Sequence, residues 1–344
     1  MQAGEGIRRA SIRQVAAAAG VSMSTVSNVL NNPHRVLAST RRRVEEAMEQ
    51  VGYVRNSAAR QLRGARSRVI GCIVPNTANP FYAALARGME DRLAEAGCVL
   101  IQCSTDAQSE REARYLHILQ EQDVGGIMVS PVSVGLERLL KVRGRGTPIV
   151  LLDRERDHTD LCAASVDNVA GGELAAQHLL GLGHRRLAYI RAEKTVPSIS
   201  DRAKGIDKAL RSAGLDPATA LMEVRVTPAA AAVVASEAMA GILAREERPT
   251  GVICFNDDTA LALLRGLRQH GIRVPSEMSV VGYDDVDFAA ELSPSLTTVR
   301  QPTYQLGHAA ADLLLSEYRS AHTHQQLLFR PELVVRDSTR APRE

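Results

Sequence analysis

The chain has 344 residues, enough for two or three domains, and 45% of them are hydrophobic, which is ample for packed cores. No uninterrupted apolar run approaches the roughly 18 residues of a membrane-spanning helix. No apolar signal core follows the N-terminal arginines either, so neither a membrane protein nor a secreted one is expected. The net charge is only +3, but the first 68 residues carry twelve arginines and four glutamates, a net of +8, whereas the rest carries a net of −5. A basic block attached to an acidic body is typical of a protein that binds a polyanion through one small domain.

Residues 11–32 predict two short helices joined by a tight turn. Ser11 and Ser22 are placed to cap them, because a serine hydroxyl accepts a hydrogen bond from a backbone N–H that the first helical turn leaves unpaired. Gly20 lies between the helices, where a left-handed backbone costs glycine little. Apolar residues that recur at helical spacing are predicted to pack the two helices together; they are Val15, Ala19, Val26, Val29 and Leu30.

The second helix is predicted to expose a short, polar and uncharged face. Small hydrogen-bonding side chains on such a helix suit the base edges of the major groove, while nearby arginines suit the phosphates. A generic helical hairpin has the same spacing, so the basic charge of the first 68 residues is what favours DNA binding. The candidate DNA-binding residues of this unit are Ser22, Met23, Ser24, Thr25, Ser27, Asn28 and Arg35.

A third helix is predicted from a cap at Ser39 or Thr40 to a stop at Gly52, which closes a helix-turn-helix headpiece over residues 1–55. Residues 56–68 are basic and contain a single large apolar side chain. A helix so short is largely unfolded by itself in water, but it would order when docked on DNA. A plain interdomain linker is the alternative interpretation of this hinge segment.

From residue 69 onward, apolar strand-like runs alternate with helical stretches. Such alternation predicts parallel sheets covered by helices on both faces, and because the pattern appears twice we expect an α/β fold with two doubly wound parallel-sheet lobes. The strand-like runs are 69–74, 98–103, 125–130, 148–153, 186–190, 222–226, 251–256, 279–284 and 333–336. The helical stretches are 80–96, 109–122, 133–143, 169–182, 202–213, 228–245, 258–270 and 304–320.

The last helix and the last strand-like run let the chain cross between the lobes again. We therefore expect residues 69–344 to form a ligand-binding and dimerisation core of two interleaved lobes. The N-terminal lobe is predicted to contain 69–166 and 301–328, and the C-terminal lobe 167–300 and 329–344.

Polar side chains follow several of the predicted strands. In open α/β sheets ligands bind outside the carboxyl ends of the strands, so two lobes that face each other there would enclose a cleft. Carboxylates accept hydrogen bonds from hydroxyl groups, arginines donate in a fixed fork, and aromatic rings suit the C–H face of a sugar. Asp and Asn at strand ends also cap helices and shape turns, which is the structural alternative for each of them. The candidates are Asn79, Phe81, Tyr82, Asp153, Arg154, Ser198, Arg202, Asn256 and Asp284.

No catalytic, cofactor or metal motif emerges from the sequence. It contains no G-x-S-x-G, no P-loop, no G-x-G-x-x-G after a strand and no histidine pair at metal spacing, and His322 and His324 lie in a polar tract. The five cysteines match no zinc pattern, and their apolar surroundings predict buried reduced thiols in a cytoplasmic protein, with a redox sensor as the alternative. We expect no enzyme activity, no cofactor and no metal.

Taken together, these features resemble the lactose-repressor/galactose-repressor (LacI/GalR) family of bacterial transcription regulators. The resemblance runs from about Ser11 to Arg336, nearly the whole chain. Its most specific parts are I-R-Q-V-A-x-x-A-G-V-S-x-x-T-V-S-N-V-L-N at 12–31, A-x-R-x-L at 58–62, V-D-N at 166–168 with G-G at 171–172, L-G-H-R-R at 182–186 and V-V-G-Y-D-D at 280–285.

The resemblance implies roles for residues of the DNA-binding segment. Met23, Ser24 and Asn28 match positions that read bases in the major groove, where an asparagine pairs with adenine through two hydrogen bonds. Leu62, which shares the A-x-R-x-L motif with Arg60, matches a leucine wedged into the minor groove at the centre of the operator. Two headpieces are needed to place two such leucines side by side, so a homodimer on pseudo-palindromic double-stranded DNA is expected.

The body resembles the periplasmic sugar-binding fold. The match to ribose-binding members favours a pentose or a similarly small sugar as effector. An aromatic residue that those proteins place near 224–228 is absent here, and the loop at 194–200 departs from theirs, so sugar acids, sugar phosphates and nucleosides stay open. The residues that match sugar-contacting positions are Asn79, Phe81, Tyr82, Asp153, Arg154, Arg202, Asn256, Asp284 and Gln301.

The function expected from the sequence is that of a sequence-specific transcriptional regulator, as a repressor, whose operator affinity is switched by a small ligand between the lobes. The ligand acts only through its different affinities for two arrangements of the protein. The alternatives are a sugar-binding or transport protein, a sugar-modifying enzyme with a nucleic-acid tether, and a family member whose corepressor is a partner protein.

Overall fold

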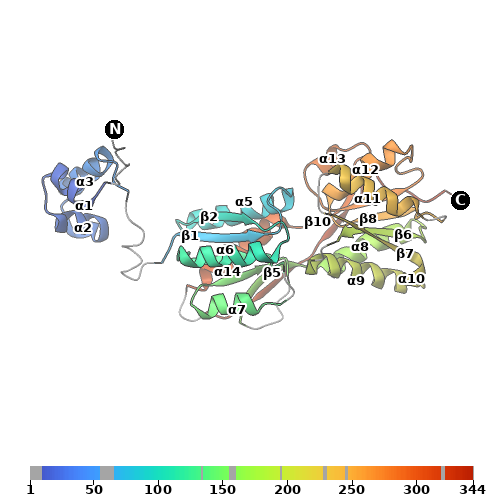
Figure 1. The fold of residues 1–344 in the computed structure, drawn as a ribbon, viewed down its shortest axis with the longest axis horizontal. Helices are drawn as coiled ribbons and strands as arrows, with labels where there is room; N and C mark the ends of the chain where they lie inside the picture. Colours follow the sequence, from blue (N-terminus) through green and yellow to red (C-terminus); the bar gives the residue numbers. More distant parts are fainter. Residues whose placement is uncertain are drawn as a thin grey trace, which may run out of the picture. The chain divides into compact units, whose positions relative to one another are not determined.

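A computed structural model of the chain describes residues 10–54, 66–132, 135–154, 160–193, 196–227, 231–244, 247–318 and 322–343 (Figure 1). The chain divides into two compact units, Met1–Arg66 and Ser67–Glu344. Arg60, Leu62 and most of the predicted hinge segment lie outside the described residues. Among the residues that are described, no helix is long and apolar enough to cross a membrane.

The first unit contains the two predicted helices and their turn. Ser11 and Ser22 accept hydrogen bonds from backbone N–H groups of the turns they cap, at Gln14 and Thr25. Gly20 has a left-handed φ of +63°, and the N–H of the next residue bonds back to the Ala16 carbonyl at 3.0 Å, which ends the first helix. The elements are α1 (Ile12–Ala19), α2 (Met23–Asn31), the 3₁₀ turn η1 (Pro33–Arg35) and α3 (Ala38–Gln50).

The core of this unit joins all three helices. The apolar residues predicted from helical spacing are buried there, except that Leu30 is half-buried. Helix α3 adds Val44 and Ala47, which close the other side of the core. The buried residues are Val15, Ala16, Ala19, Val26, Val29, Val44 and Ala47.

The predicted start of the third helix is wrong. Helix α3 begins at Ala38, and Leu37 occupies the N-cap position without any side-chain hydrogen bond. Ser39 and Thr40 lie inside the first turn, because the extended backbone that precedes the helix ends already at Leu37. The end is as expected: Gly52 has a φ of +65° just beyond the helix.

The N-lobe of the second unit is built on a six-stranded parallel sheet with strand order β11-β5-β4-β3-β1-β2. Its two strands at one side, β5 and β11, were not predicted, since one is a run of small residues and the other is short and only half-buried. The strands are β1 (Val69–Val74), β2 (Val99–Ser104), β3 (Gly126–Val129), β4 (Ile149–Leu152), β5 (Cys162–Val166) and β11 (Gln326–Phe329).

The C-lobe has a second six-stranded sheet with strand order β12-β10-β9-β8-β6-β7. Five strands are parallel, four of them predicted; β10 was not predicted, and β12 pairs antiparallel with it at the edge. The strands are β6 (Leu187–Ala192), β7 (Leu221–Val226), β8 (Gly251–Cys254), β9 (Ser279–Asp284), β10 (Thr297–Arg300) and β12 (Glu332–Val334).

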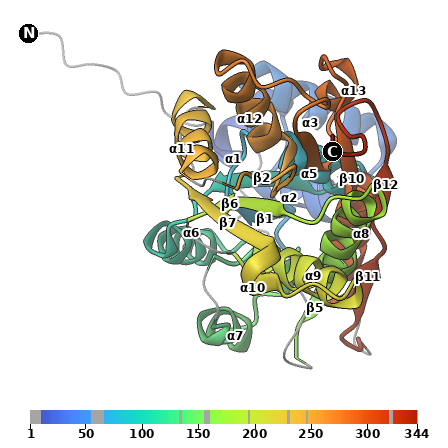
Figure 2. The ribbon, with the colours of Figure 1, turned by 90° about the vertical axis from the view of Figure 1, so that its right-hand side faces the viewer.

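Helices cover both faces of each sheet, as the alternation of strands and helices predicts. In the N-lobe, α5 and α14 pack on one face, and α6 and α7 on the other. In the C-lobe, α11, α12 and α13 lie on one face and α8 and α9 on the other (Figures 1 and 2). The helices are α5 (Pro80–Glu95), α6 (Ser109–Glu121), α7 (Glu137–Gly144), α8 (Asn168–Gly181), α9 (Pro197–Ser212), α10 (Pro217–Ala220), α11 (Ala231–Leu243), α12 (Asp257–Gln269), α13 (Phe288–Glu291) and α14 (Thr303–Ser316).

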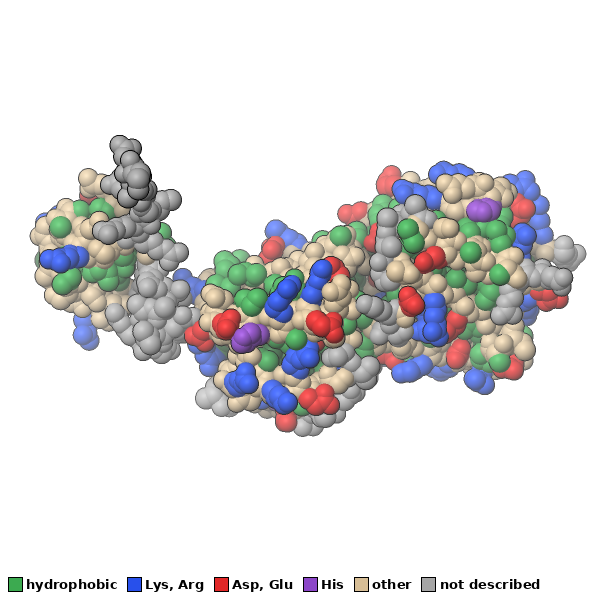
Figure 3. Space-filling model, viewed as in Figure 1, with side chains coloured by type: hydrophobic (Ala, Val, Ile, Leu, Met, Phe, Trp, Pro, Cys, Tyr) green, Lys and Arg blue, Asp and Glu red, His purple; other side chains and the backbone are tan. Residues whose placement is uncertain are grey.

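The chain passes between the two lobes three times. It leaves the N-lobe after β5, returns from β10 to α14, and leaves again between β11 and β12. The surface of this unit is mixed in charge: Lys and Arg side chains are interspersed with Asp and Glu on the face that Figure 3 shows. That mixture agrees with the small net charge of the chain beyond residue 68.

The five cysteines are free thiols, but the prediction that they are buried holds for only three of them. Cys72, Cys162 and Cys254 are buried, and burial raises the pKa of Cys72 to about 12, which keeps it protonated. Cys98 directly precedes the edge strand β2 and Cys103 lies in it, and both are half-buried, because no further strand covers that edge.

Helices α8 and α9 approach each other closely through glycines. A Cβ atom added to Gly172 would overlap the backbone carbonyl of Arg202, and one added to Gly205 would overlap that of Val169. A backbone atom cannot turn aside as the end of a side chain can, so any larger residue at either position pushes the helices apart. This crossing fixes where α9 presents Arg202.

We therefore predict that Gly172→Ala lowers the free energy of unfolding by about 1–3 kcal/mol, the usual cost of overpacking. The matched control is Gly181→Ala in the same helix, where an added Cβ meets nothing within 4 Å. That variant should lose no stability, because alanine has the higher helix propensity. Urea unfolding followed by circular dichroism measures both. Equal stability of the two variants would contradict the close crossing.

Candidate ligand-binding cleft and DNA-facing helix

Helix α2 presents an exposed polar face, as predicted. Met23 is 56% exposed, and Ser22, Ser24 and Asn28 are exposed as well. Thr25 and Ser27 are half-buried, and Arg35 is exposed at the end of the 3₁₀ turn.

Hydrogen bonds divide the small polar residues of this helix into two groups. The hydroxyl of Ser22 lies 2.7 Å from that of Ser24 and 2.8 Å from that of Thr25, and it caps the helix. The side-chain amide of Asn31 donates to the Ser27 carbonyl at 2.7 Å. These contacts hold the helix end together, whereas Met23 and Asn28 present their side chains to solvent. Helix α2 is therefore short and exposes an uncharged surface, the kind of surface with which a recognition helix contacts base edges.

A cavity of about 540 Å³ lies between the two lobes of the second unit. That is within the usual size range for small-molecule sites. Seven of the nine predicted effector-binding residues line it: Asn79, Phe81, Tyr82, Asp153, Arg202, Asn256 and Asp284. They come together because the carboxyl ends of the parallel strands in both lobes meet at this cavity.

The N-lobe wall is built by the turn from β1 into α5. Asn79 caps α5 by accepting a hydrogen bond from the Phe81 N–H at 2.8 Å, and Pro80 occupies the first helical position. The rings of Phe81 and Tyr82 meet edge to face with centroids 5.0 Å apart, and both are buried. The start of α5 thus presents two aromatic rings at the cavity. On the C-lobe side Asn256 caps α12 in the same way, accepting from the Thr259 N–H at 2.9 Å.

Two carboxylates reach the cavity from strained backbone positions. Asp153 follows β4 with a φ of +50°, and Asp284 ends β9 with a φ of +116°. Positive φ values in residues other than glycine cost of order 1–3 kcal/mol and concentrate at functional sites. The Gln301 side-chain amide donates to Asp284 at 2.7 Å and holds it in place.

Arg202 is the buried cation of the site, with 6% of its surface exposed. Its guanidinium lies 3.6 Å from the centre of the Tyr283 ring, and one of its nitrogens donates to the Phe255 carbonyl. Its Nε donates to Oδ1 of Asn168 at 2.9 Å, and the amide nitrogen of Asn168 donates to Asp153 at 3.2 Å. Asn168 therefore couples the arginine of one lobe to the carboxylate of the other.

Burial shifts the pKa of these ionisable groups. Desolvation raises the pKa of Asp153 despite the opposing effect of Arg202, and it raises the pKa of Asp284 well above its ordinary value. Desolvation also lowers the pKa of Arg202, but Tyr283, Asp284 and Asp153 raise it by more, so the arginine stays charged. The site is one fixed positive charge between two carboxyl groups that are easier to protonate than usual.

Two predicted residues do not line the cavity. Arg154 is buried beside a smaller space of about 160 Å³ that Asp201 and Lys204 also line, because the strained turn at Asp153 directs the next residue away. Gln301 is 4% exposed, and it contacts the site through its hydrogen bond to Asp284. Its Oε1 has no hydrogen-bond partner among the described residues.

Sequence reasoning missed several residues of the site. Asn168 is part of the V-D-N motif, but its role as a bridge was not assigned. Phe255 directly follows β8 and lines the cavity, so the C-lobe wall contains an aromatic ring. Helix α9 begins at Pro197, earlier than predicted, since proline suits the first helical position. Its first turn brings the candidate Ser198 to the cavity, together with Ile199, which was not predicted.

Comparison with known proteins gives the same division of the chain. Residues 11–56 match the family described as bacterial regulatory proteins, lacI family, and residues 176–339 match a periplasmic binding protein-like domain. The HTH-type transcriptional repressor PurR of Aliivibrio fischeri strain ATCC 700601 / ES114 is 35% identical over 334 residues, which cover 96% of this chain and 98% of the relative.

Solved structures of LacI-family regulators match the fold of this chain. A LacI family transcriptional regulator from Enterococcus faecium with bound ribose matches with a TM-score of 0.73 and 29% identity, covering 79% of this chain and 99% of that one. The lac repressor dimer bound to operator and the anti-inducer ONPF matches with a TM-score of 0.83 and 26% identity, covering 97% and 100%. These proteins are transcriptional regulators and not enzymes, as expected from the sequence. The chain therefore belongs to the lacI family of bacterial regulatory proteins and is a DNA-binding transcriptional regulator with a ligand-binding domain.

Proposed function

We propose that the protein is a repressor whose operator affinity is switched by a neutral polyhydroxylated ligand, most closely a pentose, bound in the interlobe cavity. The observation that carries the proposal is the charge of the cavity wall. Its lining contains four aspartates and one arginine: Asp106, Asp153, Asp258, Asp284 and Arg202. Carboxylates accept hydrogen bonds from sugar hydroxyls, whereas they repel carboxylate and phosphate groups. The wall therefore disfavours the sugar acids and sugar phosphates that the sequence leaves open.

The remaining parts of the cavity suit a small ring. Phe81 and Tyr82 offer apolar surface on one side, and Phe255 with Val226 offers it on the other. The amide oxygens of Asn79 and Asn256 are used in helix caps, so their amide N–H groups are the donors that face a ligand. The ribose bound to the regulator from Enterococcus faecium supports a pentose of this size.

The switch is assigned to the contact between the lobes. Asp153 belongs to the N-lobe and Arg202 to the C-lobe, and Asn168 joins them directly after the first crossing of the chain. A ligand that forms hydrogen bonds to both Asp153 and Asp284 has a higher affinity for the arrangement in which the lobes hold these two residues at the right distance. That difference in affinity is the only source from which a ligand can shift the equilibrium between two arrangements.

On the DNA side, we assign base contacts to Met23, Ser24 and Asn28 and phosphate contacts to Arg35 and Arg60. Leu62 is proposed as the minor-groove wedge. The protein acts as a homodimer on a pseudo-palindromic site, in line with the lac repressor dimer bound to operator. The uncovered edge strand β2 supports self-association, because Val99 is 58% and Ile101 47% exposed there.

The ligand proposal predicts that D-ribose raises the melting temperature of the wild-type protein and that Asp284→Asn weakens its binding about ten- to a hundredfold. A hydrogen bond to a charged group contributes about 1.5–3 kcal/mol, which gives that range. Asp287→Asn is the matched control, an exposed aspartate three residues further on. A thermal-shift series with pentoses, hexoses and nucleosides measures the effect. A ribose shift that survives unchanged in Asp284→Asn would refute the assignment of the cavity.

The pKa shifts predict how binding depends on pH. Because burial raises the pKa of Asp153 and Asp284, these groups take up protons at a higher pH than ordinary aspartates when the solution is acidified. A protonated carboxyl loses acceptor capacity, so ligand affinity should fall as the pH falls from neutral. Titration calorimetry at several pH values measures this dependence, which should be weaker in Asp284→Asn. Affinity that rises on acidification would contradict the prediction.

The DNA proposal predicts that Asn28→Ala weakens specific operator binding and relaxes the preference for one base pair by about 1–3 kcal/mol. Leu62→Ala should weaken operator binding without changing ligand binding. Gln50→Ala is the control, an exposed amide at the end of α3. Selection of duplexes from a random pool, followed by gel shifts at several salt concentrations, measures all three. Wild-type affinity and base preference in Asn28→Ala would exclude the base contact.

A further inference from the structure

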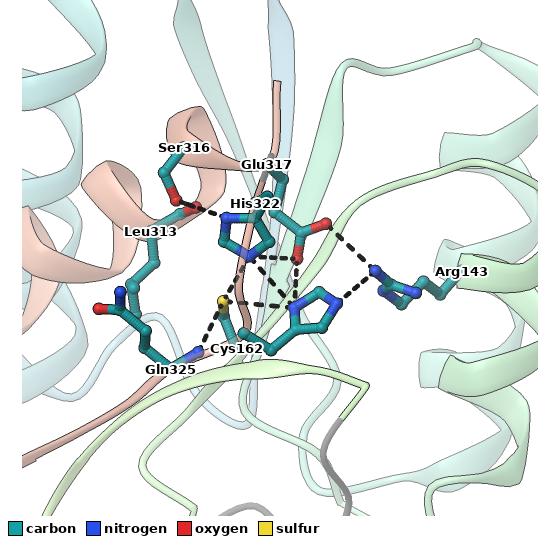
Figure 4. Close-up of polar contacts among 8 residues, drawn as sticks. Arg143, Cys162, Leu313, Ser316, Glu317, His322 and Gln325 are labelled. Atoms are coloured by element: carbon teal, nitrogen blue, oxygen red, sulfur yellow. Dashed lines mark hydrogen bonds and ion pairs between the residues drawn. The ribbon is translucent and has the colours of Figure 1, made fainter. Parts of the chain in front are cut away.

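The N-lobe contains a cluster of four side chains of types that can bind a metal (Figure 4). None of the four lines the cleft. Four ligand atoms, one from each of Cys162, Glu317, His322 and His324, all lie within 4.8 Å of one another. The side chains of Glu317, His322 and His324 are 6%, 11% and 16% exposed, and Cys162 is buried. We propose that this cluster binds one Zn²⁺ ion per chain.

The distances within the cluster are those of a tetrahedral site. Bond lengths of about 2.0–2.3 Å place the ligand atoms of tetrahedral zinc about 3.3–3.6 Å apart. Cys162 Sγ lies 3.2 Å from His322 Nε2 and 3.6 Å from His324 Nδ1, and the two nitrogens are 3.2 Å apart. The nearer oxygen of Glu317 lies 3.8 Å and 3.4 Å from the same nitrogens. A cation at the centre reaches all four atoms with small adjustments.

Three segments of the chain build the cluster at the amino end of the sheet. Cys162 is the first residue of β5, and Glu317 directly follows α14. His322 and His324 precede β11, and residues two apart in extended chain share a side. The pairing of β11 with β5, begun by the 3.0 Å hydrogen bond from Ala163 N–H to the Gln325 carbonyl, brings both histidines to the cysteine.

Neighbouring hydrogen bonds fix the tautomer of His322 so that Nε2 can bind a metal. The hydroxyl of Ser316 lies 2.6 Å from the Leu313 carbonyl, to which it donates its one proton, and 3.1 Å from Nδ1 of His322. Nδ1 must therefore be the donor to Ser316, which leaves the lone pair on Nε2, the nitrogen that faces Cys162. Fixing the tautomer from outside in this way is typical of metal-binding histidines. The N–H of Gln325 points at the Cys162 sulfur from 3.5 Å and suits a thiolate.

Arg143 contacts two of the four candidate ligands, Glu317 and His324, from outside the cluster. Its guanidinium lies 3.6 Å from the Glu317 carboxylate and 2.5 Å from Nε2 of His324. A guanidinium only donates, so without metal the proton of His324 lies on Nδ1. When Nδ1 binds the metal, Nε2 carries the proton and can no longer accept from Arg143. The guanidinium must then turn away from His324, while it keeps the contact with Glu317. The arginine thus orients the carboxylate in both states.

The donor set selects the class of metal. One thiolate, two imidazoles and one carboxylate suit a borderline cation such as Zn²⁺ better than Mg²⁺ or Ca²⁺, which prefer oxygen. Four protein ligands in a largely buried site are typical of a structural zinc, not a catalytic one. The ion would join the end of α14 to β5 and to the start of β11.

The test uses the full-length protein without a histidine tag, stripped with a chelator and reloaded with Zn²⁺ or Co²⁺. We expect one equivalent of metal per chain after gel filtration, measured by mass spectrometry of the elements. The Co²⁺ form should show the strong visible bands of tetrahedral coordination and a sulfur-to-metal charge-transfer band. Zn²⁺ should also raise the melting temperature of the stripped protein.

Matched variants locate the site. Cys162→Ser should lose the charge-transfer band, and His322→Gln should lose stoichiometric binding. Cys103→Ser, a half-buried cysteine of β2, and His117→Gln, an exposed histidine of α6, should retain both signals. Circular dichroism checks that each variant is folded.

Two results would overturn the proposal, and the first needs no variant. One is wild-type protein that retains far less than one equivalent of metal, or whose Co²⁺ spectrum lacks the sulfur band. The other is a folded Cys162→Ser variant with the wild-type Co²⁺ spectrum.

Discussion

All strands but one of the two sheets run parallel, and this gives each sheet two chemically different ends. At the carboxyl ends the chain turns from strands into helices, and the helix starts supply N–H donors, capping amides and aspartates to one cavity. At the amino end of the N-lobe sheet the chain returns from α14, and the cysteine–histidine cluster lies there. Strand β5 connects the two ends of the sheet, since Cys162 begins it and Asn168 lies two residues beyond its last residue, at the start of α8 in the C-lobe.

Keeping Arg202 charged inside the protein requires the partners that surround it. An unpaired buried charge is too costly to persist, and a charge paired with only one buried carboxylate is seldom stabilising. Here the aromatic face of Tyr283, the Phe255 carbonyl and the Asn168 amide share the cation. The carboxyl groups of Asp153 and Asp284 remain partly uncompensated, as their raised pKa values show. A ligand that donates hydrogen bonds to those carboxyls compensates them and is therefore bound favourably.

The headpiece and most of the strands could be predicted from the sequence, and seven of the nine residues predicted for the cleft line it. Serine caps, apolar spacing and the rule that ligands bind at carboxyl ends of strands are local signals, and they are strong here. The predictions failed where local signals are weak or conflict. Strand β5 consists of small residues, and Ser39 looked like a cap although the extended backbone already ends at Leu37.

Features that depend on how distant segments of the chain pair could not be predicted from local sequence patterns. Arg154 is directed away from the cleft by the strained turn at Asp153, which only the backbone reveals. The cysteine–histidine cluster brings Cys162 together with residues more than 150 positions later, and the pairing of β5 with β11 places them side by side. The spacing rules for zinc motifs therefore had nothing to detect in this chain.

The three crossings between the lobes also determine when this protein can first fold during its synthesis. The N-lobe sheet lacks β11 and the C-lobe sheet lacks β12 until Gln326–Val334 has been made, although the other ten strands come earlier. The hydroxyl of Ser338 then closes the C-lobe, accepting from the Thr297 N–H at 2.8 Å and donating to the Val280 carbonyl at 2.6 Å. The headpiece, a separate compact unit built from local contacts, has no such delay. We therefore expect the headpiece of a ribosome-bound chain to fold before either lobe of the second unit is complete.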